Sequence, residues 1–99
     1  MKIISWNVNG VRAVARKGFA NQIKNWNADI ICLQETKAQD AEVRQALADV
    51  NEYDVFSFSA IRKGYSGTSI LTKHHPISVT YGLGVDEHDQ DGVLILSTF

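Results

Sequence analysis

The chain of 99 residues is long enough for one small domain, and its 44% hydrophobic and 21% charged content is ordinary for a globular protein and does not indicate disorder. No stretch approaches the ~20 consecutive apolar residues of a membrane span, and the N-terminus enters a predicted strand instead of a signal peptide, which favours a cytoplasmic protein over a membrane protein. The net charge of −1 does not by itself indicate a polyanionic partner, and the single Cys32 excludes an internal disulfide.

The first predicted element is a strand over residues 2–8, which closes on Asn7 and is followed by Asn9. Residues 10–17 are predicted to form a loop that leads into a helix over residues 18–26. The apolar positions of this helix repeat at spacings of four and three, at Phe19, Ile23 and Trp26. We expect this helix to cross over to the next strand.

The second predicted strand starts at Asp29 and is a continuous apolar run, short enough to be buried on both faces like the first. It ends in Gln34, Glu35, Thr36 and Lys37. Because a right-handed crossover makes the two strands parallel, their carboxyl ends fall on the same edge of one sheet. Asn7 and Glu35 are therefore expected to meet.

An amide oxygen beside a carboxylate is a pair of hard ligands that suits Mg²⁺ or Mn²⁺, at the sheet edge where open α/β proteins place their ligands. The alternative is that Glu35 only begins a solvated loop and that Asn7 caps the helix after it. The pattern alone favours this plainer interpretation slightly, because strand ends are commonly polar.

The rest of the chain is predicted to add one helix and four strands. Asp40 is the expected N-cap of an amphipathic helix ending near Asn51, with Glu42, Arg44 and Asp49 facing water. The strands are predicted at 53–58, 68–72, 77–81 and 93–99, separated by turns and by Pro76. The fold class is therefore α/β (α+β), a βαβα unit followed by a β-meander.

Basic side chains are concentrated in the first 37 residues. This segment holds six Lys and Arg against two acids, whereas residues 38–99 hold four against nine. A surface that faces phosphate groups needs such a local excess, although six cations are also ordinary solubilising charge. The six are Lys2, Arg12, Arg16, Lys17, Lys24 and Lys37.

Other polar groups in the sequence do not have the spacing of a metal site. His74 and His75 are adjacent in a turn, so these two and His88 are interpreted as surface histidines and not as zinc ligands. The acidic stretch lacks the glycine and the final glutamate of a Ca²⁺ loop and is interpreted as a solvated hairpin. Its acids are Asp86, Glu87, Asp89 and Asp91. Cys32 lies in an apolar run and is expected to be a small buried hydrophobe.

Four separated motifs occur in one order: Trp6-Asn7-Val8-Asn9-Gly10-Val11-Arg12-Ala13, Leu33-Gln34-Glu35-Thr36-Lys37, Lys63-Gly64-Tyr65-Ser66-Gly67 and Tyr81-Gly82-Leu83-Gly84. Together they resemble the exonuclease III type of abasic-site (AP) endonuclease, within the endonuclease/exonuclease/phosphatase superfamily. The resemblance covers essentially the whole chain, and it matches only the first part of a family domain. One such motif alone would be a weak signal.

The resemblance implies the N-terminal portion of a four-layer αββα sandwich, so residues 1–99 are expected to form a single partial domain. It places Asn7 and Glu35 at the catalytic metal site, with Glu35 as the ligand of Mg²⁺ (or Mn²⁺) and Asn7 orienting it. The candidate contacts to the DNA backbone are Asn9, Arg12, Lys37 and Tyr65. Gly64 and Gly67 allow a close backbone approach there, and Arg62 and Lys63 extend the basic track.

The sequence also departs from the family pattern. Asp91-Gly92 is followed by Val93, where family members commonly carry an arginine. Family members place a catalytic tyrosine, an Asp-Asn pair and an Asp-His pair beyond the region that matches this chain. The 99-residue chain alone is therefore expected to be catalytically incompetent, with an uncovered sheet face and edge that a second chain or self-association would cover.

Three functions are consistent with the resemblance. The first is a Mg²⁺-dependent AP endonuclease with 3′–5′ exonuclease activity on duplex DNA, in base excision repair and with a nucleoid-associated location. The second keeps the superfamily but changes the substrate to a phosphoinositide, sphingomyelin or an RNA tail; Lys37 and the turn 64–67 favour DNA instead. The third is a non-catalytic truncated paralogue or fragment that binds DNA or a partner chain, which Val93 favours.

Overall fold

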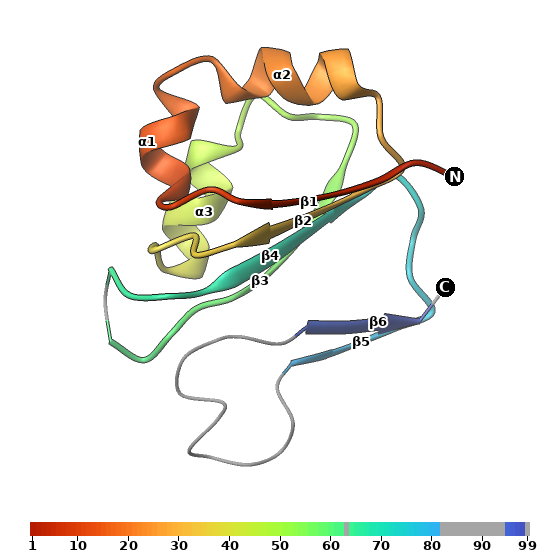
Figure 1. Cartoon of the computed structure of the whole chain (residues 1–99). Helices are drawn as coiled ribbons and strands as arrows, with labels where there is room; N and C mark the ends of the chain where they lie inside the picture. Colours follow the sequence, from red (N-terminus) through yellow and green to blue (C-terminus); the bar gives the residue numbers. More distant parts are fainter. Residues whose placement is uncertain (63, 82–94, 99) are drawn as a thin grey trace.

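The computed structural model describes residues 1–62, 64–81 and 95–98, the last four by their backbone alone. It consists of a four-stranded sheet, a two-stranded sheet and three helices (Figure 1). In chain order the elements are β1 (Ile3–Asn7), α1 (Val11–Ala15), α2 (Phe19–Trp26), β2 (Ile30–Gln34), α3 (Asp40–Ala46), β3 (Asp54–Phe58), β4 (Thr68–Thr72), β5 (Ser78–Tyr81) and β6 (Ile95–Thr98).

The larger sheet has the strand order β1-β2-β4-β3. β1 and β2 are parallel, with Asn7 opposite Gln34, as predicted from the crossover. β4 runs antiparallel to both β2 and β3. The three helices cover one face of this sheet, and β5 and β6 lie on the other (Figure 1). The rings of Phe58 and Tyr81 meet edge to face between the two sheets, with centroids 6.0 Å apart.

The hydrophobic core lies between the larger sheet and the helices. Alternate residues of the two central strands point to this side, where Ile31 and Leu71 are fully buried and Leu33 is 1% exposed. The helices contribute Val11, Phe19, Ile23 and Val43, and Leu47 adds to the core directly after α3. The predicted apolar positions of the first long helix are confirmed, because Phe19 and Ile23 are buried and Trp26 packs against Phe19.

The N-terminal loop prediction is wrong, because residues 11–15 form the helix α1. Its inward side chains, Val11 and Val14, are only one turn apart, so the segment is too short to show a helical period. The predicted N-cap of α3 is also wrong. Gln39 holds that position, and Glu42 accepts a hydrogen bond from its backbone N–H at 3.0 Å.

The predicted β-meander is wrong in part. β3 and β4 form an antiparallel hairpin, but the chain then leaves this sheet, and β5 pairs with β6 in the second one. Pro76 lies in the connection between β4 and β5, and it has no backbone N–H to donate to a hydrogen bond between paired strands. β4 occupies the inner position between β2 and β3, and its side chains are accordingly more deeply buried than those of β3.

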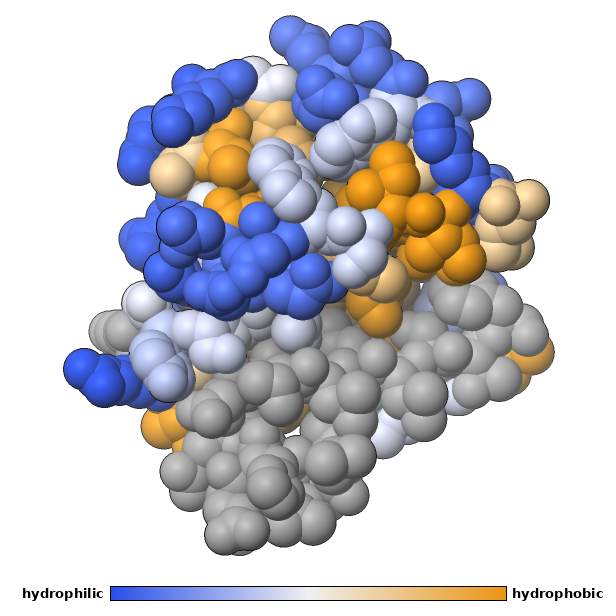
Figure 2. All heavy atoms as spheres, viewed as in Figure 1, coloured by the Kyte–Doolittle hydropathy of each residue, from blue (hydrophilic) through white to orange (hydrophobic). Residues whose placement is uncertain are grey.

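β1 is less buried than predicted for a strand covered on both faces. It lies at the edge of the described sheet, where Ile3 is 60% and Trp6 39% exposed. Apolar surface lies over the start of this strand in Figure 2. Only Ile4 on β1 is half-buried, where it packs against the core. This edge therefore leaves apolar side chains exposed beside an unpaired strand in the described sheet.

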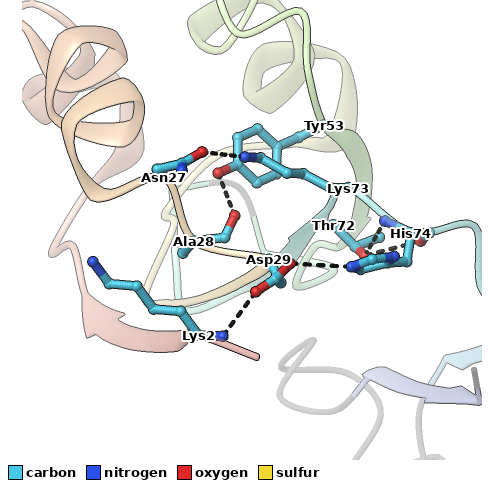
Figure 3. A network of polar contacts seen from close by, with 8 residues as sticks. All are labelled: Lys2, Asn27, Ala28, Asp29, Tyr53, Thr72, Lys73 and His74. Atoms are coloured by element: carbon cyan, nitrogen blue, oxygen red, sulfur yellow. Dashed lines mark hydrogen bonds and ion pairs between the residues drawn. The ribbon is translucent and has the colours of Figure 1, made fainter.

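A polar network locks the sheet at the end where β2 begins (Figure 3). Asp29 accepts a hydrogen bond from the backbone N–H of Lys2 at 2.8 Å and contacts the His74 ring at 3.2 Å. The Tyr53 hydroxyl donates to the Ala28 carbonyl at 2.5 Å. The network therefore joins the start of β1, β2 and β3 to the end of β4. Among the described residues, no helix is long and apolar enough to cross a membrane.

Candidate functional site

Two strand ends bring an amide and a carboxylate together, as predicted. β1 and β2 are parallel neighbours, so Asn7 and Glu35 leave the same edge of the sheet. The Asn7 side-chain nitrogen donates a hydrogen bond to Glu35 Oε2. Asn7 Oδ1 accepts a hydrogen bond from the backbone N–H of Asn9 at 3.0 Å. With both ends of its amide engaged, Asn7 holds one oxygen of Glu35 in place and leaves the other accessible.

The backbone around this pair is unusual. Asn9, Glu35, Lys37 and Ser66 all have positive φ angles, between 47° and 53°. Non-glycine residues in this region each cost about 1–3 kcal/mol unless the surroundings impose the conformation, and such strain gathers at functional sites. The conformation turns the side chains of Glu35 and Lys37 out of the strand direction, toward solvent.

Two neighbouring segments hold the strained turn after β2 by backbone hydrogen bonds. The N–H groups of Gly10 and Val11 donate to the carbonyls of Glu35 and Thr36 at 2.8 and 2.9 Å. From the other side, the N–H groups of Thr36 and Lys37 donate to the carbonyls of Gly67 and Ser66 at 3.1 and 2.7 Å. Three loops distant in sequence therefore form one rigid support beneath Glu35.

Gly67 is required by this close approach. Its φ is +92°, and a Cβ placed on it would lie 2.5 Å from the buried Thr36 Oγ1. Such a distance is shorter than any real contact, so a side chain here would push the two loops apart. That Gly67 also lets backbone amides approach a DNA strand remains a prediction.

Lys37 reaches toward the Asn7–Glu35 pair. Its Nζ lies 2.5 Å from Asn9 Oδ1 and 3.9 Å from Glu35 Oε1. The side chains of Lys37 and Glu35 are 39% and 46% exposed, so water screens their attraction. Asn9, Lys37 and Glu35 thus present an amide, a cation and an anionic acceptor on one surface.

Arg12 lies beside this cluster on α1. Its terminal nitrogens contact Glu42 Oε2 at 2.8 Å and the Lys37 carbonyl at 3.1 Å. Glu42 is 42% exposed, in line with its predicted water-facing position, but its pairing with Arg12 was not predicted. Arg44 and Asp49 are exposed as predicted. The available signal for Glu42 was its spacing of three from Gln39, which is typical of a capping box.

Tyr65 stands on the turn that follows β3 and is 51% exposed. The Arg62 guanidinium lies over its ring, 5.6 Å from the centroid. A hollow of about 330 Å³ is lined by Glu35, Lys37, Gly64, Tyr65 and Ser66. The structure therefore brings Tyr65 into one concave surface with Glu35 and Lys37. Lys63 lies outside the described residues.

The other candidate groups lie away from this site. His74 and His75 are exposed, and they contact Asp29 and Asp54 at the opposite end of the sheet. Cys32 is half-buried, and burial raises the pKa of its thiol, which keeps it in the unreactive form. His88, the acidic stretch and Val93 lie outside the described residues.

The residues at the sheet edge fit a hard divalent cation. Mg²⁺ binds through one or two carboxylates and keeps several waters, or takes substrate oxygens in their place. Glu35 supplies one such carboxylate on the solvent side. Within residues 1–62 and 64–81, no three His, Cys, Asp or Glu side chains gather closely enough to form an all-protein cage. The donor set therefore suits an open Mg²⁺ or Mn²⁺ site and not a structural zinc site.

Comparison with known proteins identifies the family. The sequence profile of the endonuclease/exonuclease/phosphatase family matches residues 4–99. The chain belongs to this family. An exodeoxyribonuclease of Bacillus subtilis is 53% identical over 100 residues, and a DNA-(apurinic or apyrimidinic site) endonuclease of Dictyostelium discoideum is 40% identical over 95 residues. These matches cover 100% and 96% of the chain.

The endonuclease/exonuclease/phosphatase fold is also found in solved structures. An AP endonuclease from Archaeoglobus fulgidus superimposes with a TM-score of 0.79 and 27% identity over 98% of the chain. The chain spans 36% of that structure, 38% of the Bacillus protein and 26% of the Dictyostelium protein. The expected α/β class and the resemblance to the first part of a family domain are confirmed.

Proposed function

We propose that the chain is the N-terminal part of a Mg²⁺-dependent (or Mn²⁺-dependent) phosphodiesterase of DNA repair. The activity proposed for the whole protein is AP endonuclease and 3′–5′ exonuclease action on duplex DNA with abasic sites. The observation that carries this proposal is the Asn7–Glu35 pair at the shared edge of β1 and β2. The Bacillus relative is an exodeoxyribonuclease and the Dictyostelium relative an AP endonuclease, which supports the choice of DNA as substrate.

Glu35 is the proposed metal ligand and Asn7 its positioning residue. When bound, the metal supplies a positive charge that stabilises negative charge developing on phosphate oxygens. Glu35 holds it through the oxygen that Asn7 leaves accessible, and Asn7 fixes the carboxylate by its own hydrogen bond. The rigid turn at residues 35–37 keeps this geometry without help from substrate.

Asn9, Arg12, Lys37 and Tyr65 are the proposed contacts to the DNA backbone. Lys37 offers a mobile charge and Arg12 a fork of donors, both within the same surface as Glu35. Tyr65 adds an exposed ring and hydroxyl on the far side of the hollow. Such contacts hold the duplex in register without reading its sequence. We also propose a cytoplasmic, nucleoid-associated location, where this substrate is found.

The test uses the chain and a duplex that carries one abasic-site analogue. We expect salt-dependent binding that Mg²⁺ strengthens, and no incision by the 99-residue chain. Glu35→Gln should remove the Mg²⁺ effect, while Glu52→Gln, an exposed glutamate outside the site, should preserve it. DNA binding of equal strength with and without Mg²⁺ in the unmodified chain and in both variants would contradict the proposed metal site. Mg²⁺-dependent incision that Glu35→Gln abolishes would contradict the expected incompetence of the chain.

The substrate is tested by competition in the same experiment. Unlabelled duplex DNA should displace the probe, whereas phosphoinositide vesicles, sphingomyelin vesicles and polyadenylate should displace it poorly. If phosphoinositide vesicles, sphingomyelin vesicles or polyadenylate displaced the probe as well as duplex DNA at the same phosphate concentration, that competitor and not DNA would be the supported substrate.

A second candidate function is that of a non-catalytic piece that binds DNA or a partner chain. The exposed β1 edge favours it, because Ile3 and Trp6 lie on a strand without an outer neighbour in the described sheet. The proposed partner is either a second copy or a polypeptide equivalent to the remainder of the relatives. Sedimentation equilibrium tests this candidate: a dimer supports it, and a stable monomer that binds no such polypeptide contradicts it.

A further inference from the structure

Glu42 joins the start of α3 to α1. One carboxylate oxygen, Oε1, accepts the backbone N–H of Gln39 at 3.0 Å, which fixes the side chain at the first turn of its own helix. The other oxygen, Oε2, lies 2.8 Å from a terminal nitrogen of Arg12. Both oxygens are therefore in use, and the carboxylate stands at a defined position in front of Arg12.

Arg12 is held in this position from a second direction. Its other terminal nitrogen donates a hydrogen bond to the Lys37 carbonyl at 3.1 Å. Because Lys37 is two residues after Glu35 in the chain, this contact ties Arg12 to the turn that carries Glu35. α1 and α3 lie side by side in Figure 1, and a groove of about 320 Å³ separates their exposed faces. The groove is lined by Arg12, Ala15, Arg16, Glu42, Gln45 and Ala46. Glu42 is the single acid among these six residues.

The pair between Arg12 and Glu42 can be exchanged easily. The two side chains are 49% and 42% exposed, and ion pairs in such positions contribute little to stability. A guanidinium fork binds a phosphate with the same geometry as a carboxylate. Glu42 contacts one terminal nitrogen of Arg12, so a phosphate that reaches this nitrogen competes with Glu42 for it, and the displaced carboxylate then repels the phosphate at close range.

We infer that Glu42 sets the affinity for nucleic acid by competing with a backbone phosphate for Arg12. The inference rests on the proposed DNA-binding function and adds a residue that acts against binding. In the free chain the Glu42 carboxylate pairs with the Arg12 guanidinium. In the complex the phosphate replaces it, and the separation of the pair offsets part of the attraction between Arg12 and DNA.

Glu42→Gln is the decisive variant, since glutamine removes the charge and still offers an oxygen to the Gln39 N–H. We expect the Kd for a short duplex to fall about two- to fivefold at low salt, as for the loss of one exposed competing charge. This gain should shrink as salt increases, because exposed charges are screened. Asp49→Asn is the matched control: the same charge is removed after α3, from an exposed residue outside this groove.

A double-mutant cycle with Arg12→Gln separates direct competition from a general charge effect. Glu42→Gln should change the Kd little when Arg12 is already replaced. The inference would be overturned if Glu42→Gln raised the affinity equally in the unmodified chain and in Arg12→Gln, or if Asp49→Asn raised it by the same factor. It would also be overturned if Glu42→Gln left the affinity unchanged or lowered it while Arg12→Gln lowered it. Absence of salt-dependent DNA binding by the unmodified chain would instead overturn the proposed function, and the inference with it. Far-UV circular dichroism confirms that each variant is folded.

Discussion

The Asn7 side-chain nitrogen donates a hydrogen bond to the Glu35 carboxylate, and this contact joins the ends of two parallel strands that are 28 positions apart in the chain. The same amide accepts the N–H of Asn9 through its oxygen. Because each atom of the amide has a partner, the contact fixes the orientation of Glu35 and does not merely fill space.

Replacing Asn7 tests this orienting role. Asn7→Ala leaves Glu35 without its donor, and the affinity for Mn²⁺ should fall about tenfold or more, as for other residues that support a metal ligand. Electron paramagnetic resonance of free Mn²⁺ measures the change. Asn7→Asp should instead bind Mn²⁺ more tightly than Asn7→Ala, since a second carboxylate favours the cation. Equal Mn²⁺ affinity in all three proteins would contradict the role.

Gly67 should tolerate a side chain poorly. Gly67→Ala places a methyl group 2.5 Å from Thr36 Oγ1 at a φ of +92°, so we expect a loss of about 1–3 kcal/mol in the free energy of unfolding. Urea denaturation measures it. Gly64→Ala is the matched control, because Gly64 also has a positive φ but nothing lies within 4 Å of the place that an added methyl group would take. Equal losses in the two variants would show that the contact with Thr36 is unimportant.

Leu71 should be a major contributor to stability. It lies on the inner strand β4 and is fully buried, so Leu71→Ala creates a cavity and should lower the free energy of unfolding by about 2–5 kcal/mol. Ile77→Ala removes a comparable side chain that is 79% exposed and should change stability by about 0.5 kcal/mol at most. Urea midpoints of the two variants compare them directly. Similar midpoints would mean that the core is not between the sheet and the helices.

Asp29 should make stability depend on pH in acid. The backbone N–H of Lys2, and then His74, lower the pKa of Asp29 below its ordinary value of 3.8. A carboxyl group with a depressed folded-state pKa contributes stability above its unfolded pKa, and this contribution is lost as pH falls through the folded pKa. Asp29→Asn should therefore be less stable than the unmodified chain at pH 7, and this difference should shrink as pH falls below 3.8.

Urea midpoints measured between pH 7 and pH 2 test this dependence. Histidine side chains in general gain charge below about pH 6.5, so the comparison is repeated in a His74→Gln background to isolate Asp29. If the urea midpoints of Asp29→Asn and the unmodified chain differed by the same amount at every pH from 7 to 2, the stabilisation would not come from the charge of Asp29.

The sequence predicted the parallel strand pair and its shared edge because an amphipathic helix lies between the two strands and β2 is an uninterrupted apolar run. It could not predict the short α1, where Val11 and Val14 give a single apolar repeat. The inner position of β4 was equally hidden, since a hairpin can present either strand to β2. The pairing of β4 with both β2 and β3 in the folded chain shows that β4 is the inner strand, and Leu71 and Ser69 are buried accordingly.

The meeting of Asn7 and Glu35 followed from topology, whereas the surroundings of the pair did not. Positive φ angles at Glu35 and Lys37 result from four backbone hydrogen bonds between distant loops, and no local propensity encodes them. The partner of Arg12 was missed for a related reason. Glu42 is one of several charged residues on α3, and only the packing of α1 against that helix selects it.

The inner position of β4 also governs the order in which the sheet can assemble. β1 and β2 can pair as soon as both have been synthesised, but β3 pairs only with β4 in the described sheet. During translation, β3 therefore emerges before the strand that receives it. A chain that ended between residues 58 and 68 would therefore leave β3 without the strand that ties it to the sheet.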